Sequence, residues 1–166
     1  MASQQDLKKI QKIKGEVRGV VFETDFNYIK KNKGEEGVAE VERKIREIEP
    51  EFSYKKIKNT EWYPLRWRIL SLLITKETFK WGQKEVFEMG RAAPRSSFVV
   101  KTLLKFFNFH KTCREAEKYW SKHYTKGKLE LAEFNDNKKR VVYRLKNFSV
   151  GNHVFCEYLT GYVQAI

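Results

Sequence analysis

The feature that most constrains this chain is a run of apolar residues between positions 64 and 78. Large apolar side chains stand on most sides of the expected helix, at Leu65, Trp67, Ile69, Leu70, Leu72, Leu73 and Ile74. A helix that is apolar nearly all round has to be covered by other elements, so we expect it at the centre of the fold. Pro64 suits the start of this helix, where the missing N–H of proline costs no hydrogen bond.

The rest of the chain carries further helical patterns that can cover this central helix. Apolar residues three and four apart predict helices over residues 19–32, 36–48, 83–90, 98–107, 113–124 and 152–166. Gly34 and Gly90 are expected to end two of these helices. Residues 91–96 then read as a loop. Residues 51–61 read as a short irregular segment, in which residues 54–58 are either a brief strand or an extended linker.

Two signals mark the elements that follow. Thr112 and Glu115 have the spacing of a capping box, which places the start of a helix at residue 113. Residues 128–134 and 139–147 alternate between apolar and polar side chains, with turn-forming residues between them, so they predict a β-hairpin. The fold class is therefore α+β, with helices packed on a small antiparallel sheet. We expect one domain over residues 15–166, preceded by a polar arm or frayed helix at residues 1–14.

The charge of the chain is strongly positive. The 34 Lys and Arg residues exceed the 21 Asp and Glu residues, which gives a net charge of +13. The cations are spread through segments that also hold core residues, so they describe a surface that favours nucleic acid, anionic membrane or an acidic protein without choosing among them. A polar N-terminus and the lack of a long apolar run predict a cytoplasmic protein without a transmembrane segment.

Several short stretches resemble a known group of ligand-binding proteins. They are Val17-Arg18-Gly19-Val20, Trp62-Tyr63-Pro64, Gly90-Arg91, Trp120 with Tyr124 and Gly127, Leu145-Lys146-Asn147-Phe148, and Cys156-Glu157-Tyr158-Leu159-Thr160-Gly161. This pattern resembles the fold shared by 4-vinyl-reductase domains, haem–nitric-oxide-binding domains and TRAPP vesicle-tethering subunits, and looks closest to an uncharacterised myxobacterial-type branch. The resemblance implies a non-enzymatic, regulatory sensor or binding module that is often dimeric, with an apolar pocket among its helices.

The candidate site residues follow from this resemblance and from the most apolar helices. Candidates for an apolar or lipid-like ligand pocket are Trp67, Leu70, Ile74, Phe107, Trp120, Phe155 and Leu159. The last predicted helix ends without a glycine, a proline or a basic turn, which favours either a truncated chain or a helix that docks on a partner subunit. Candidates for a homodimer or partner interface are therefore Tyr158, Tyr162 and Ile166.

Haem and zinc find little support in the residues. The haem-binding branch carries a Tyr-x-Ser-x-Arg signature, and the nearest string here, Tyr119-Trp120-Ser121-Lys122-His123, ends in histidine instead of arginine. The zinc pattern of 4-vinyl-reductase domains needs more cysteines than Cys113 and Cys156 provide. We expect neither cofactor.

Catalytic motifs are also missing from the sequence. It contains no GxGxxG, no phosphate-binding loop and no HExxH, so we predict a protein that is not an enzyme. A small-molecule binding or sensing domain that also contacts proteins is the first hypothesis. The alternative is a basic nucleic-acid-binding module, because cations and aromatic residues interleave over residues 62–68, 79–81 and 105–111.

Overall fold

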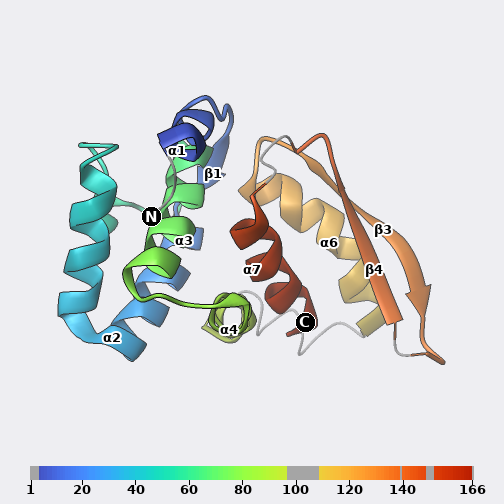
Figure 1. The fold of residues 1–166 in the computed structure, drawn as a ribbon. Helices are drawn as coiled ribbons and strands as arrows, with labels where there is room; N and C mark the ends of the chain where they lie inside the picture. Colours follow the sequence, from blue (N-terminus) through green and yellow to red (C-terminus); the bar gives the residue numbers. More distant parts are fainter. Residues whose placement is uncertain (1–3, 97–108, 139, 149–151, 166) are drawn as a thin grey trace.

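The computed structural model describes residues 4–96, 109–138, 140–148 and 152–165 (Figure 1). In chain order the elements are α1 (Gln4–Gln11), β1 (Glu16–Arg18), α2 (Val20–Arg46), the 3-10 turn η1 (Tyr54–Lys56), β2 (Trp62–Pro64), α3 (Leu65–Thr78), α4 (Gln83–Ser96), α6 (Phe109–His123), β3 (Lys128–Asn135), β4 (Arg140–Lys146) and α7 (His153–Gln164). Over these ranges the protein is α+β, as predicted, with two separate two-stranded antiparallel sheets.

The helices form two groups that meet at α7. Figure 1 shows α1, α2 and α3 on one side, the β3–β4 hairpin with α6 on the other, and α7 between them. Helix α4 lies across the lower end of α7 in this view. Buried side chains from both groups belong to one continuous core. Segments from the two ends of the chain are therefore packed together in one body.

Helix α3 is the central element that its apolar sequence predicts. Leu65 and Leu70 have no exposed surface, and Leu72 is 2% exposed. Helix α2 packs along α3 and contributes Phe22 and Ile29 to the same core. The burial of residues on nearly every side of α3 explains why its sequence carries so few polar positions.

Gly34 separates the two halves of α2, close to the predicted boundary between two helices. Its φ of 71° and ψ of −175° lie outside the helical region, so the helix axis changes direction there. Glycine adopts this positive φ at little cost, whereas a side chain would be strained. The helical periodicity predicted on either side is confirmed by the burial of Phe22 and Ile29 before Gly34 and of Val41 and Ile45 after it.

The prediction of a brief strand or an extended linker at residues 54–58 is wrong in part. Residues 54–56 form the turn η1, because the Tyr54 ring is buried against the core and its hydroxyl lies 2.8 Å from the Ser71 hydroxyl. Strand β2 then pairs with β1, with Arg18 opposite Trp62 and Glu16 opposite Pro64. The sequence pattern could not predict these strands, since three residues are too few to show an alternation.

The predicted helix end at Gly90 and the loop at residues 91–96 are also wrong, because α4 continues to Ser96. Helix α7 crosses α4 at this point. A Cβ atom at Gly90 would overlap the carbonyl oxygen of Tyr158, and one at Gly161 would overlap the carbonyl oxygen of Phe87. The two glycines therefore permit a close helix crossing, and Gly90 does not act as a stop signal.

Helix α6 differs from its prediction at its start. It already includes Phe109, so positions 112 and 115 lie inside the helix and not at its start. The predicted helix over residues 98–107 falls outside the described residues. The prediction for the last helix is confirmed: α7 begins after Asn152, whose side-chain oxygen accepts a hydrogen bond of 2.9 Å from the Val154 N–H.

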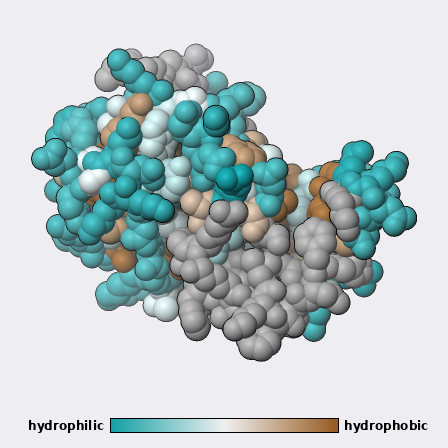
Figure 2. All heavy atoms as spheres, turned by 90° about the horizontal axis from the view of Figure 1, so that it is seen from below, coloured by the Kyte–Doolittle hydropathy of each residue, from teal (hydrophilic) through white to brown (hydrophobic). Residues whose placement is uncertain are grey.

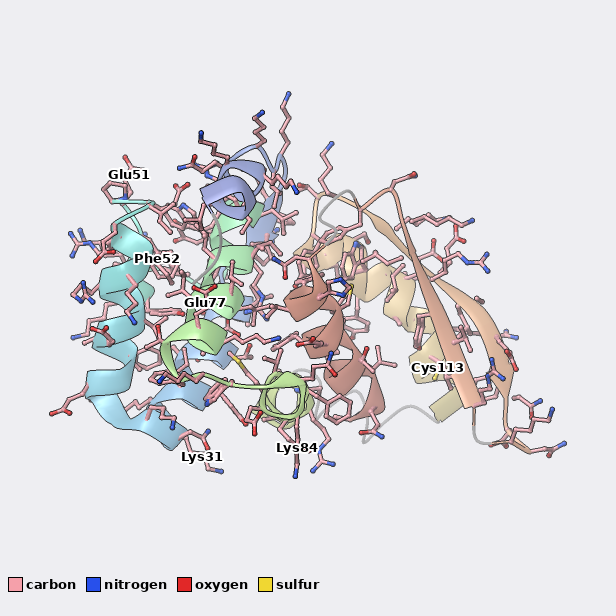
Figure 3. The ribbon with its side chains drawn as sticks, in the orientation of Figure 1. Lys31, Glu51, Phe52, Glu77, Lys84 and Cys113 are labelled. Atoms are coloured by element: carbon pink, nitrogen blue, oxygen red, sulfur yellow. The ribbon has the colours of Figure 1, made fainter. Side chains whose placement is uncertain are left out.

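The predicted hairpin is confirmed. Leu129 lies opposite Leu145, and Leu131 lies opposite Tyr143. Their side chains share one face of the hairpin because residues two apart on a strand point the same way. The Tyr143 hydroxyl donates a 3.0 Å hydrogen bond to the carbonyl oxygen of Cys113, a residue that Figure 3 shows on α6 beside the hairpin. This face of the hairpin therefore rests on α6.

Candidate functional site

A buried ion pair joins α2 to α3. The guanidinium of Arg68 donates to the carboxylate of Asp25, and neither side chain has any exposed surface. The Ser71 hydroxyl donates to the same carboxylate oxygen over 2.7 Å. The ring of Tyr158 from α7 lies 4.4 Å from the guanidinium carbon, measured to the ring centroid. This polar cluster thus connects three helices.

Two tyrosines near this cluster, Tyr54 and Tyr124, have raised pKa values and remain neutral. Burial raises the pKa of Tyr54 well above its usual range, although the hydrogen bond with Ser71 opposes this shift. Burial also raises the pKa of Tyr124, against a smaller opposing effect of the nearby charge of Arg68. The Asp25 and Arg68 side chains have no exposed surface, so each charge depends on its partner inside the core.

The sequence did carry a signal for this pair that motif searches miss. Asp25 stands three residues after Phe22 and four before Ile29, so it occupies the apolar face of its helix. Arg68 has the same relation to Leu65 and Leu72. A single charge on an inward face of each of two helices is a pattern that indicates a buried partner.

The predicted pocket residues lie in the packed core. Trp67, Leu70, Ile74, Trp120 and Phe155 are each at most 7% exposed. Leu159 is half-buried against the same core, and Phe107 falls outside the described residues. Aromatic rings fill the space between them. The rings of Trp120 and Tyr124 are stacked with centroids 4.2 Å apart, and those of Phe148 and Phe155 with centroids 5.0 Å apart.

Two surface cavities lie elsewhere, with mixed polar and apolar linings. One of about 260 Å³ lies between α2 and η1 and is lined by Glu23, Phe26, Asn27, Tyr54, Lys55, Ile57 and Asn59. The other, of about 450 Å³, lies between α6 and the start of β3 and is lined by Arg114, Glu117, Lys118, Trp120, Ser121, Gly127, Lys128 and Leu129. Of the pocket candidates on described residues, Trp120 alone lines either cavity. The expected apolar pocket does not coincide with these two spaces.

The predicted interface residues need one correction. Tyr158 is 3% exposed and contacts Arg68, so its side chain is not accessible to a partner subunit. Tyr162 is half-buried on the same helix, and burial raises the pKa of its hydroxyl well above the usual range. Ile166 falls outside the described residues. Tyr162 is thus the candidate that keeps an exposed part.

The string that resembles a haem signature lies within α6 and its side chains spread around the helix. Trp120 points into the core, whereas Ser121 and Lys122 are exposed. The His123 ring nitrogen Nδ1 lies 2.8 Å from the carbonyl oxygen of Tyr119 in its own helix. Among the described residues, His, Cys, Asp and Glu side chains form no group of three that could hold a metal ion. The same part of the chain has no helix that is both long and apolar enough to cross a membrane.

A basic surface covers the N-terminal end of the fold. Helix α1 packs Leu7 and Ile10 toward the core, and its lysines therefore face outward. We call the N-terminal basic surface the set of cations made by Lys8, Lys9, Lys12, Lys14, Arg18 and Lys126. Over the described ranges, none of these six forms an ion pair with a carboxylate. Figure 3 shows long side chains with nitrogen tips extending outward from this end of the molecule.

The fold brings this surface together from two distant parts of the sequence. Val17 forms a β-bridge with Tyr124. Glu16 and Thr125, 109 residues apart, exchange two hydrogen bonds of 2.7 and 3.0 Å that involve the backbone N–H of each residue. Lys126 consequently packs against Gly15, next to Lys14. The sequence could not place Lys126 here, because its partner segment lies at the other end of the chain.

One aromatic side chain belongs to the edge of this surface. The Arg18 guanidinium lies over the Trp62 ring, 4.1 Å from its centroid, and Arg18 also donates a hydrogen bond to the Thr60 carbonyl oxygen. Both side chains are half-exposed. A cation over an indole ring is an electrostatically favourable pair, so Arg18 is held in place while part of it remains accessible to solvent.

Comparison with known proteins adds no relative. A scan against protein-family models, a search of curated proteins and a search of solved structures each found no match to this chain. The fold and the N-terminal basic surface are therefore the basis for the proposed function.

Proposed function

We propose that this chain is a non-enzymatic binding module that holds nucleic acid on its N-terminal basic surface. The observation that carries this proposal is the set of six cations from two distant segments that have no carboxylate partner among the described residues. Lysines without an internal partner remain free to neutralise phosphates, and release of the counterions bound to nucleic acid then drives binding.

The charge distribution of other surfaces supports this choice. On the hairpin, Lys146 pairs with Glu130 over 2.8 Å, and on α2 Arg43 pairs with Glu40 over 3.0 Å. Hydrogen bonds from Arg43 and Lys44 lower the pKa of Glu40 to about 2, so that carboxylate stays charged and compensates its neighbours. The six cations of the N-terminal basic surface form no such ion pair among the described residues, which favours an anionic partner there.

A membrane surface fits these observations less well. An amphipathic helix binds a bilayer through its apolar face, yet Leu7, Ile10 and Ile13 are turned inward and pack on the core. Figure 2 shows another face, seen from below, on which atoms of hydrophilic residues predominate over the described residues and apolar ones gather in small groups. An apolar or lipid-like ligand is the hypothesis that the family resemblance implies, and the two cavities described above, lined by described residues, both mix charged and apolar side chains.

The test is a titration of a labelled oligonucleotide by fluorescence anisotropy at two salt concentrations. We expect the triple variant Lys8→Gln, Lys9→Gln, Lys12→Gln to lose about tenfold or more in affinity at low salt and to show a shallower salt dependence, because up to three phosphate contacts are removed. A matched control is Lys31→Gln, Lys56→Gln, Lys84→Gln, which removes the same charge from exposed lysines on α2, η1 and α4. Equal losses in both triple variants would contradict a specific surface, and a wild-type chain that does not bind at low salt would end the proposal.

A further inference from the structure

We infer that the N-terminal basic surface takes single-stranded nucleic acid, with an unpaired base stacking at the Arg18–Trp62 pair. This inference rests on the proposed function and names its partner more closely. Its basis is the position of an accessible aromatic–guanidinium pair at the edge of a surface whose other members are lysines.

The pair is fixed by the backbone around it. Arg18 and Trp62 are direct neighbours across the antiparallel strands β1 and β2, so their side chains leave the sheet on the same side. The hydrogen bond from Arg18 to the Thr60 carbonyl oxygen holds the guanidinium over the indole. Side chains that are already ordered lose little conformational freedom when a ligand stacks on them, which favours binding.

The chemistry of the pair suits an unpaired base. Bases stack on aromatic rings and on the plane of a guanidinium, and every base has such a face, so this contact tolerates many sequences. In a duplex the base faces are already stacked on one another and are not available. Arg18 and Trp62 therefore discriminate between single strands and duplexes, whereas the lysines do not.

The lysines lie within reach of the same strand. Lys126 packs against Gly15, three residues before Arg18, which corresponds to about 10 Å along an extended chain. Helix α1, a rod of about 12 Å, adds Lys8 and Lys9, and Lys12 follows directly after its last residue. A base at Arg18–Trp62 and phosphates at Lys14 and Lys126 can thus belong to one short stretch of nucleic acid.

The experiment compares one single-stranded oligonucleotide with the duplex of the same sequence, by anisotropy titration at low and moderate salt. We expect Trp62→Leu to weaken single-strand binding by about 5- to 100-fold, the range that corresponds to the loss of one base stack. Duplex affinity should change less than twofold. Arg18→Lys, which keeps the charge and loses the planar group, should shift the two affinities in the same selective way.

Controls separate a stacking effect from a folding effect. Trp81→Leu replaces another half-buried tryptophan, which packs on Tyr28 and Phe79 away from the surface, and should leave both affinities unchanged. Circular dichroism and thermal unfolding of each variant show whether it is folded, and Arg18→Lys provides the test if Trp62→Leu is not.

The outcomes distinguish this inference from the proposed function. Selective loss of single-strand binding supports the inference. Equal wild-type affinity for both forms, with no effect of Trp62→Leu or Arg18→Lys, overturns the inference and leaves nucleic-acid binding in place. Absence of binding to either form at low salt, or binding to vesicles that contain phosphatidylserine and not to oligonucleotides, overturns both.

Discussion

The α2–α3 region and the hairpin region of this protein are stabilised by different interactions. Helix α3 is covered from several sides, and Leu65, Arg68 and Leu70 have no exposed surface. In β3 and β4, every residue whose side chain is described is half-buried or exposed. The hairpin is supported by α6 on one face and carries charged pairs such as Lys146–Glu130 on the other. Burial supplies most folding free energy, so the first region should dominate the stability of the whole chain.

Contacts between aromatic rings add further stability to the α2–α3 region. Phe52, which Figure 3 shows between α2 and α3, makes edge-to-face contacts with the rings of Phe22, Tyr54 and Trp67 at centroid distances of 6.0, 4.9 and 5.4 Å. Such geometry adds a favourable quadrupole interaction to the buried area. The ion pairs on the outer face of the hairpin are exposed to water and contribute little.

The largest effect is expected at the buried ion pair. Asp25→Ala leaves the Arg68 charge without its partner in the core and should lower the free energy of unfolding by about 3–5 kcal/mol. Urea unfolding followed by circular dichroism measures this change. The double variant Asp25→Leu, Arg68→Met removes both charges and should recover most of the loss. If the free energy of unfolding of Asp25→Ala falls by clearly less than the lower end of that range, the α2–α3 region is not the dominant source of stability.

A smaller effect is expected where the two regions are joined. Gly90→Ala places a Cβ atom against the Tyr158 carbonyl oxygen and forces α4 and α7 apart, at a cost of about 1–3 kcal/mol. Gly82→Ala is the control, because its Cβ would meet only the end of the flexible Glu85 side chain at 3.2 Å. Thermal unfolding of both variants compares them. Similar melting temperatures for the two would show that the crossing tolerates a wider separation.

The smallest effect is expected in the hairpin. Tyr143→Phe removes the hydrogen bond to the Cys113 carbonyl oxygen and should cost about 0.5–1.5 kcal/mol, toward the lower end because the site is half-exposed. Tyr54→Phe removes a hydroxyl from the core and leaves Ser71 with one partner fewer, so its cost should be larger. Urea titrations of the two variants give the ranking directly. The reverse order would contradict the contrast between the two regions.

Elements that show a repeating apolar pattern could be predicted from the sequence. Features that depend on contacts between distant segments could not. Helix α3 has many apolar residues within a short stretch, and β3 and β4 alternate several times between apolar and polar residues. Both patterns can therefore be recognised in the sequence. Gly90 is not a helix end as predicted, because a glycine that permits a close helix crossing looks the same in sequence as one that ends a helix. Strands β1 and β2 were missed because each has three residues and stability comes from a partner more than 40 positions away.

The candidate site was less predictable than the fold for the same reason. The composition shows an excess of cations, and residues 62–68 mix cations with aromatic rings. Which cations gather is decided by the Val17–Tyr124 bridge, which no local pattern encodes. The apolar pocket candidates were chosen as large inward side chains, and such side chains most often pack as ordinary core.

The bridge between Val17 and Tyr124 has a thermodynamic consequence. Lys14 and Lys126 are neighbours only while the chain is folded, so a polyanion that binds across both of them binds the native state in preference to the unfolded state. At a ligand concentration 100 times the Kd, such linkage raises the free energy of unfolding by about 2.7 kcal/mol. If oligonucleotide binds this surface as proposed, the melting temperature should rise with oligonucleotide concentration and fall back as salt is added, so that stability reports the occupancy of the surface.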